Sequence, residues 1–129
     1  MMRVGIAGYG VVGKTRHRSI ESNTSYQVTA ISESSEKARK SIPEGMTVYN
    51  DYKTLIASAE LDVIFISLPN QFAAEAACLS LQKGLHVFCE KPPARTHAEL
   101  LEVEKQSLKF PELKLMYGFN HRFHFSVEE

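Results

Sequence analysis

Short apolar runs alternate with longer polar or mixed segments along the whole chain. Runs rich in β-branched and aromatic residues predict strands at 4–7, 28–31, 46–49, 63–66, 87–89 and 115–117. The segments between them predict helices at 11–21, 36–40, 51–56, 72–83 and 96–107. Strands that alternate with helices through short links predict an α/β fold, a doubly wound parallel sheet of the Rossmann type.

Local signals support this order of elements. The run at 63–66 is apolar without alternation, as expected of a central strand that is covered on both faces. Thr96 and Glu99 form a T-x-x-E capping box, and Gly84 stands where a helix end favours a left-handed residue. Because no linker, repeat or low-complexity segment is visible, residues 1–129 are expected to form one domain.

Three glycines follow the first predicted strand with the spacing G-x-G-x-x-G. In a strand–turn–helix unit, Gly8 permits the tight turn and Gly10 lets a pyrophosphate approach the bare backbone. Gly13 lets the helix pack closely on the strand. Val11 and Val12 would then place their amide groups at the start of the helix, where anions bind.

The same stretch also fits G-x-x-x-x-G-K-T, the phosphate loop of many nucleotide triphosphatases, with Lys14 on the phosphates and Thr15 on magnesium. Such an enzyme needs a second strand that ends in an acidic residue, whereas Asp62 stands before the run 63–66. A dinucleotide site needs an acidic residue about 20 positions beyond the glycines, at the tip of the second strand. Glu33 stands there, beside Ser32, and favours the dinucleotide interpretation.

Composition adds further limits. The 15 basic and 15 acidic residues balance, so no net field favours nucleic acid or an anionic membrane. Cys78 and Cys89 lack metal-ligand spacing and are expected to be small buried side chains, so no metal site is predicted. Neither a signal-peptide pattern nor an apolar span is visible, and a cytoplasmic location is expected. A solvated helix face is expected for the cluster Lys14, Arg16, His17 and Arg18.

Four stretches together point to a known family. They are 8–13 (G-Y-G-V-V-G), 68–70 (L-P-N), 84–92 (G-L-H-V-F-C-E-K-P) and 118–123 (G-F-N-H-R-F). With them, the chain resembles the N-terminal NAD(P)-binding Rossmann domain of the Gfo/Idh/MocA oxidoreductases, named for glucose-fructose oxidoreductase and inositol 2-dehydrogenase. The run that ends in E-K-P is the most specific match.

The resemblance implies a nicotinamide ring near Glu90-Lys91-Pro92. Lys91 would be the catalytic residue, offering a cation near a substrate hydroxyl or carbonyl. Glu90 would hydrogen-bond the nicotinamide ribose, and Pro92 would fix the backbone between them. From spacing alone, an exposed Glu90-Lys91 pair before a proline-marked turn is slightly favoured, because such pairs are common.

Further cofactor contacts are implied at two other loops. Leu68, Pro69 and Asn70 would line the cofactor, although Asn70 also fits the N-cap of the next helix. Asn120 and Arg122 follow the sixth strand, where the family places residues against the nicotinamide or the substrate.

The choice of cofactor is expected to depend on Ser32 and Glu33. The resemblance places the family's usual acidic position at Ser32, one residue before Glu33. NADP-preferring relatives often place an arginine after such a serine, whereas Glu33 would repel a 2′-phosphate and accept from ribose hydroxyls. NAD is therefore favoured, and NADP stays possible.

The resemblance covers about the first third of a full-length member, which carries a second, substrate-binding α/β domain and is usually a homo-oligomer. The chain is thus expected to be the cofactor domain of an NAD(P)-dependent dehydrogenase for a sugar, sugar derivative or polyol, inactive alone. A stand-alone, non-catalytic dinucleotide-binding module is the alternative, and a phosphate-loop triphosphatase is a distant third.

Overall fold

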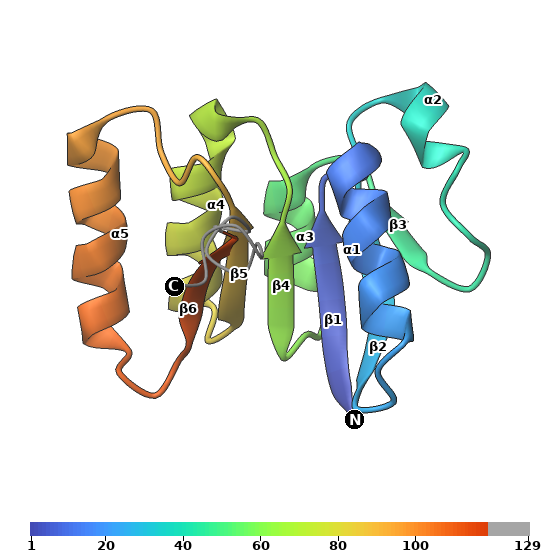
Figure 1. Ribbon diagram of the computed structural model, residues 1–129, viewed down its shortest axis with the longest axis horizontal. Helices are drawn as coiled ribbons and strands as arrows, with labels where there is room; N and C mark the ends of the chain where they lie inside the picture. Colours follow the sequence, from blue (N-terminus) through green and yellow to red (C-terminus); the bar gives the residue numbers. More distant parts are fainter. Residues whose placement is uncertain (119–129) are drawn as a thin grey trace, which may run out of the picture.

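The computed structural model describes residues 1–118 and shows one twisted sheet with helices on both faces (Figure 1). All strand pairs are parallel, and the strands lie in the order β3-β2-β1-β4-β5-β6. The predicted doubly wound sheet is confirmed. Asn120 and Arg122 lie outside the described residues. The strands are β1 (Met2–Ala7), β2 (Tyr26–Ser32), β3 (Thr47–Tyr49), β4 (Val63–Ile66), β5 (His86–Glu90) and β6 (Leu115–Gly118).

The helices divide between the two faces of the sheet. Helix α1 covers one face beside β1 and β2, whereas α3, α4 and α5 cover the other face (Figure 1). The short helix α2 lies near the end of the sheet at which the strands finish. The helices are α1 (Val11–Glu21), α2 (Glu36–Arg39), α3 (Tyr52–Ser58), α4 (Asn70–Gln82) and α5 (His97–Lys109).

Side-chain caps explain where several helices begin. Asp51 accepts from the amide of Thr54 at the start of α3, and Thr96 accepts from the amide of Glu99 at the start of α5. The Glu99 carboxylate does not complete the predicted capping box on Thr96; it accepts instead from the amide and guanidinium of Arg95. Gly84 has a φ of +90°, so the predicted left-handed residue after α4 is confirmed.

Alternating residues of the strands build two separate cores. Val4 and Ile6 of β1 pack with Ile20 of α1, whereas Ile64 and Ile66 of β4 pack with α3 and α4 on the opposite face. Central parallel strands that are buried on both faces explain the continuous apolar runs of the sequence. None of the helices within residues 1–118 has the length and apolar character needed to cross a bilayer.

The α1 face of the sheet is only partly covered. A groove of about 590 Å³ lies beside α1 over β4, β5 and β6. Phe65 and Phe88 stack in this groove, with ring centroids 4.9 Å apart. The guanidinium of Arg16 lies above Phe88, which brings α1 close to the end of β5.

Candidate dinucleotide site

The loop after β1 meets the loop after β4 where the strand order reverses. Gly8 has a φ of +94°, and a Cβ placed on it would lie 2.4 Å from the carbonyl oxygen of Ser67. The amide of Ser67 in turn donates to the carbonyl of Ala7 over 2.8 Å. Ligands of doubly wound sheets bind in the crevice at this position. The glycine turn and the segment Leu68-Pro69-Asn70 therefore border the same end of the sheet.

Gly13 and Gly10 have opposite surroundings. A Cβ on Gly13 would lie 2.1 Å from the carbonyl oxygen of Gly8, so close packing of α1 on the turn requires glycine there. A Cβ on Gly10 would meet no protein atom within 4 Å. Gly10 is the N-cap of α1, and no side chain caps the first amides of this helix. The exposed residues Val11 and Val12 thus leave amide groups available to an anion at a bare stretch of backbone.

Ser32 and Glu33 hold the glycine turn from the end of β2. The carbonyl of Ser32 accepts from the amide of Gly8 over 2.9 Å, while the Ser32 side chain is 1% exposed. The two carboxylate oxygens of Glu33 accept from the amides of Tyr9 and Ser35, each over 2.8 Å. Glu33 is half-buried, so it is the acidic group that borders the site, whereas the side chain of Ser32 lies within the fold.

Tyr9 and His17 form a buried pair beneath the turn that sequence reasoning missed. The Tyr9 hydroxyl and His17 Nδ1 lie 2.7 Å apart, and His17 Nε2 lies 3.1 Å from a carboxylate oxygen of Glu21. His17 is only 3% exposed, so the expectation that it belongs to a solvated face is wrong. The signal was helical spacing, because Gly13, His17 and Ile20 recur on one face of α1 and that face packs on the sheet.

Arg16 is the second residue of that cluster for which the solvated-face expectation is wrong. Its Nε donates to Oε1 of Glu90, and the two side chains are only 20% and 14% exposed. Glu90 lies on the same face of β5 as Phe88, whose ring centroid is 4.8 Å from the Arg16 guanidinium. The alternative that Glu90 belongs to an exposed surface pair is therefore also wrong.

The other predicted residues at the carboxyl ends of β4 and β5 lie at or near the surface. Lys91 and Pro92 are exposed directly after β5, and the peptide bond between them is cis. Pro69 is the N-cap of α4 and Asn70 its first residue, so the N-cap assignment of Asn70 is wrong. Leu68 is half-buried, and Pro69 and Asn70 are exposed at the carboxyl end of β4.

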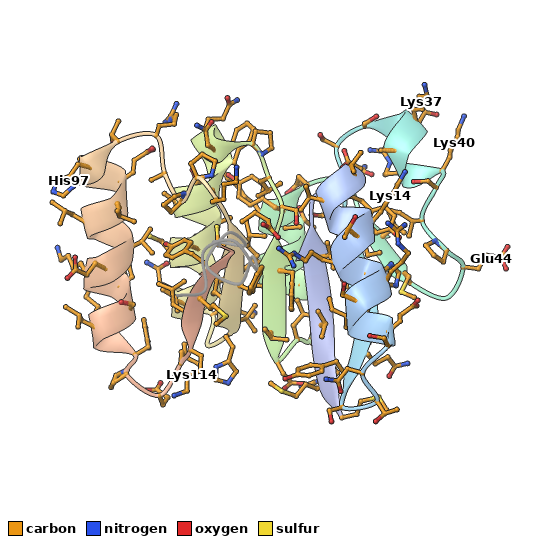
Figure 2. The ribbon with its side chains drawn as sticks, in the orientation of Figure 1. Lys14, Lys37, Lys40, Glu44, His97 and Lys114 are labelled. Carbon is orange, nitrogen blue, oxygen red and sulfur yellow. The ribbon has the colours of Figure 1, made fainter. Side chains whose placement is uncertain are left out.

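The rim near the glycine turn is basic. Lys14 of α1, Lys37 of α2 and Lys40, the C-cap of α2, lie toward the end of the sheet where β1 and β2 finish (Figure 2). Lys14 Nζ is 6.0 Å from the centroid of the Tyr9 ring. These cations favour an anionic ligand at this end of the fold.

The cysteines behave as packing residues. Burial raises the pKa of the Cys89 thiol to about 12, and burial also raises the pKa of Cys78. A thiol with a raised pKa is a poor nucleophile at neutral pH. Neither cysteine therefore adds a reactive group to the site.

Helix α1 already begins at Val11, so residues 11–15 are helical and only 8–10 form the turn. The longer loop and free hydroxyl of a triphosphatase are missing, because Thr15 Oγ1 donates to the carbonyl of Val11 over 3.0 Å. Strand order, glycine turn and acidic residue define a Rossmann dinucleotide-binding domain.

The family model described as the Gfo/Idh/MocA oxidoreductase family, NAD-binding Rossmann fold, matches residues 2–118, so the chain belongs to this family. D-glucoside 3-dehydrogenase of Escherichia coli is 29% identical over 99% of this chain and 37% of its own length. Inositol 2-dehydrogenase of Salmonella typhimurium is 28% identical over 95% of this chain and 38% of its own.

A crystal structure of scyllo-inositol dehydrogenase from Lactobacillus casei with bound NAD(H) and scyllo-inositol superimposes with a TM-score of 0.87. It is 26% identical and is matched over 98% of this chain and 38% of its own. This chain thus spans less than half the length of the relatives that it matches.

Proposed function

We propose that this chain is the cofactor-binding part of a dehydrogenase that oxidises a hydroxyl group of a sugar, sugar derivative or polyol with NAD. The observation that carries the proposal is the open backbone at Gly10, beside the uncapped start of α1 and the Glu33 carboxylate. The substrate class is supported by relatives that are named as glucoside and inositol dehydrogenases.

The adenosine half of the cofactor would lie at the glycine turn. Gly10 would admit the pyrophosphate, and the amides of Val11 and Val12 would donate to it. Gly8 and Gly13 would act indirectly, since their contacts with Ser67 and with each other shape the turn. Glu33 would accept from the ribose hydroxyls through lone pairs that its bonds to Tyr9 and Ser35 leave available.

The nicotinamide half would lie at the ends of β4 and β5. Leu68, Pro69 and Asn70 would line it, and Glu90 would accept from its ribose. Pro92 would set the direction of the chain after Lys91. Asn120 and Arg122 complete this proposed set and lie beyond the described residues.

Lys91 is the proposed catalytic residue. The bound nicotinamide would supply the chemistry of hydride transfer. The exposed Lys91 ammonium would lie beside the substrate hydroxyl and stabilise the negative charge that develops on its oxygen. Since the relatives are much longer than this chain, we assign the substrate pocket to a second domain. We also propose that the full-length protein is a homo-oligomer and that it is located in the cytoplasm.

A titration of the 129-residue chain tests the proposed function. NADH should bind with a saturable change in its fluorescence, and calorimetry with ATP and magnesium should give much weaker binding or none. Tight binding of ATP with magnesium, together with no binding of NADH, would overturn the proposal.

A further inference from the structure

Arg16 is held between two groups that belong to different parts of the fold. Its Nε donates to Oε1 of Glu90, and its guanidinium lies 4.8 Å from the centroid of the Phe88 ring. Phe88 is itself stacked on Phe65 of the neighbouring strand. An arginine that is mostly buried, paired with a carboxylate and stacked on an aromatic ring keeps a well-defined side-chain position.

The second oxygen of Glu90 is confined as well. Gly118 of β6 pairs with Glu90, and a Cβ on Gly118 would lie 2.7 Å from Oε2 of Glu90 and 3.2 Å from Cζ of Phe88. The carboxylate therefore lies between Arg16 on one side and the bare backbone of Gly118 on the other. It is fixed in place although it stands at the end of a strand, next to the exposed Lys91.

Arg16 also connects the two halves of the proposed site. It lies on α1, whose first turn borders Gly10, while Glu90 begins the E-K-P segment at the end of β5. We propose that Arg16 is a positioning residue, which holds the Glu90 carboxylate where it can accept from the nicotinamide ribose. This inference rests on the proposed function, because it assumes that NAD(H) lies across the ends of β1 and β5.

The pair has a definite energetic role. Arg16 keeps a half-buried carboxylate oriented before the cofactor arrives, so binding does not have to order it. Without Arg16, the Glu90 carboxylate would be left partly buried without its cation, and it would turn toward water. The loss of Arg16 should therefore weaken binding of the nicotinamide half of the cofactor and leave binding of the adenosine half unchanged.

A comparison of NADH binding with ADP binding separates the contacts of the nicotinamide half of the cofactor from those of the adenosine half, because ADP lacks the nicotinamide and its ribose. Dissociation constants for both ligands should be measured on the 129-residue chain and on Arg16→Gln, Arg16→Lys, Glu90→Gln and the double variant Arg16→Gln/Glu90→Gln. Arg18→Gln is the matched control, since Arg18 is an exposed arginine of the same helix and donates to Thr15 over 3.3 Å. Melting temperatures verify that each variant is folded.

We expect Arg16→Gln and Glu90→Gln each to weaken the affinity for NADH about fivefold or more, while the affinity for ADP changes less than twofold. The double variant should be no worse than either single variant, because both remove the same pair. Arg16→Lys should recover part of the NADH affinity, and Arg18→Gln should match the unmodified chain with both ligands. If Arg16→Gln does not fold, Glu90→Gln and Arg16→Lys test the pair by the same comparison.

Equal weakening of NADH and ADP would overturn the inference, as would unchanged NADH affinity in Arg16→Gln. Either result would leave the proposed function standing, since the unmodified chain would still bind NADH. Failure of the unmodified chain to bind either ligand would refute the proposed function and this inference with it.

Discussion

At the scale of single residues, the glycines of one motif meet different physical demands. Gly8 and Gly13 are required by the protein itself, because a Cβ on either would lie within 2.4 Å of a backbone oxygen. Gly10 meets nothing within 4 Å, so its lack of a side chain has no explanation in the packing of the described residues. A ligand that approaches the backbone at Gly10 would explain why no side chain is present there.

Glu33 carries a prediction on cofactor choice. A carboxylate beside a 2′-phosphate sets like charges a few ångströms apart, so the chain should bind NAD(H) about tenfold or more tightly than NADP(H), about 1.4 kcal/mol. Glu33→Arg should narrow or invert this preference. Dissociation constants for NADH and NADPH on both proteins check it.

The structure adds a control that the sequence did not suggest. Glu33 accepts from the amides of Tyr9 and Ser35, so Glu33→Arg also removes support from the glycine turn. Glu33→Gln keeps a hydrogen-bond acceptor there but loses the charge. It should reduce the preference for NAD(H) over NADP(H), and it should weaken the affinity for NADH less than Glu33→Arg does. A preference for NADPH in the unmodified chain would show that Glu33 does not set the choice.

At the scale of elements, an ion pair joins β1 to the start of β4. The backbone amide and the guanidinium of Arg3 both donate to the Asp62 carboxylate, over 2.7 to 3.2 Å. These hydrogen bonds lower the pKa of Asp62 from 3.8 to about 2. The charged form of Asp62 therefore stabilises the fold at neutral pH.

Asp62→Asn should destabilise the chain at pH 7. Because water screens side chains that are 46% and 35% exposed, the expected cost is about 0.5–1 kcal/mol. The pKa is lowered on folding, so the stabilisation is present above about pH 4 and is lost as the pH falls through about 2. Urea unfolding at pH 7 and at pH 3 should show that the difference in unfolding free energy between Asp62→Asn and the unmodified chain is smaller at pH 3. Glu60→Gln alters a highly exposed partner of Arg3, so it should change the unfolding free energy little. A constant difference at both pH values would contradict this account.

The order of the elements could be predicted because local signals agree with the fold. Helix α1 was predicted with the bounds that it has, Val11–Glu21, and strand β4 with the bounds Val63–Ile66. Strand ends were less exact: β1 begins at Met2 because the Met2 amide donates to the carbonyl of Ser25 and the strand pairs with β2 from Met2 onward.

The errors at Arg16, His17 and Glu90 share one cause, which is burial of charged or polar groups by tertiary contacts. Arg16 and His17 appear as part of a charge run in the sequence, but they face the sheet and pair with Glu90 and Tyr9. No local pattern shows that a carboxylate more than 70 residues away will lie beside Arg16. Helical spacing shows which face is buried, and it does not show the partner.

At the scale of the whole molecule, the two ends of the proposed cofactor path are joined through α1. This helix begins at the glycine turn, and it reaches the end of β5 through Arg16 and Glu90. Lys91, however, is the only catalytic group proposed within residues 1–118. A site that is open to water cannot hold a substrate carbon against the nicotinamide, and misplacement by about 1 Å can cost about a hundredfold in rate.

The 129-residue chain should therefore bind NAD(H) yet oxidise no sugar or polyol at a measurable rate. A longer version that carries a second domain of the family's kind should turn over, and Lys91→Ala in that protein should lower the rate about a hundredfold or more while NADH still binds. Absorbance of NADH at steady state gives the rate, and fluorescence gives the binding. Continuous NADH production by the short chain would show that it holds a complete catalytic site.

The central claim is that the backbone at Gly10 receives the pyrophosphate of NAD(H). The most direct measurement is the dissociation constant for NADH of Gly10→Val, with its melting temperature as the check on folding. Since the space beside Gly10 is empty of protein atoms and its φ is −79°, valine fits the fold but occupies the place of the ligand. We predict NADH affinity at least tenfold weaker, about 1.4 kcal/mol or more, with little change in melting temperature. NADH affinity equal to that of the unmodified chain would contradict the account.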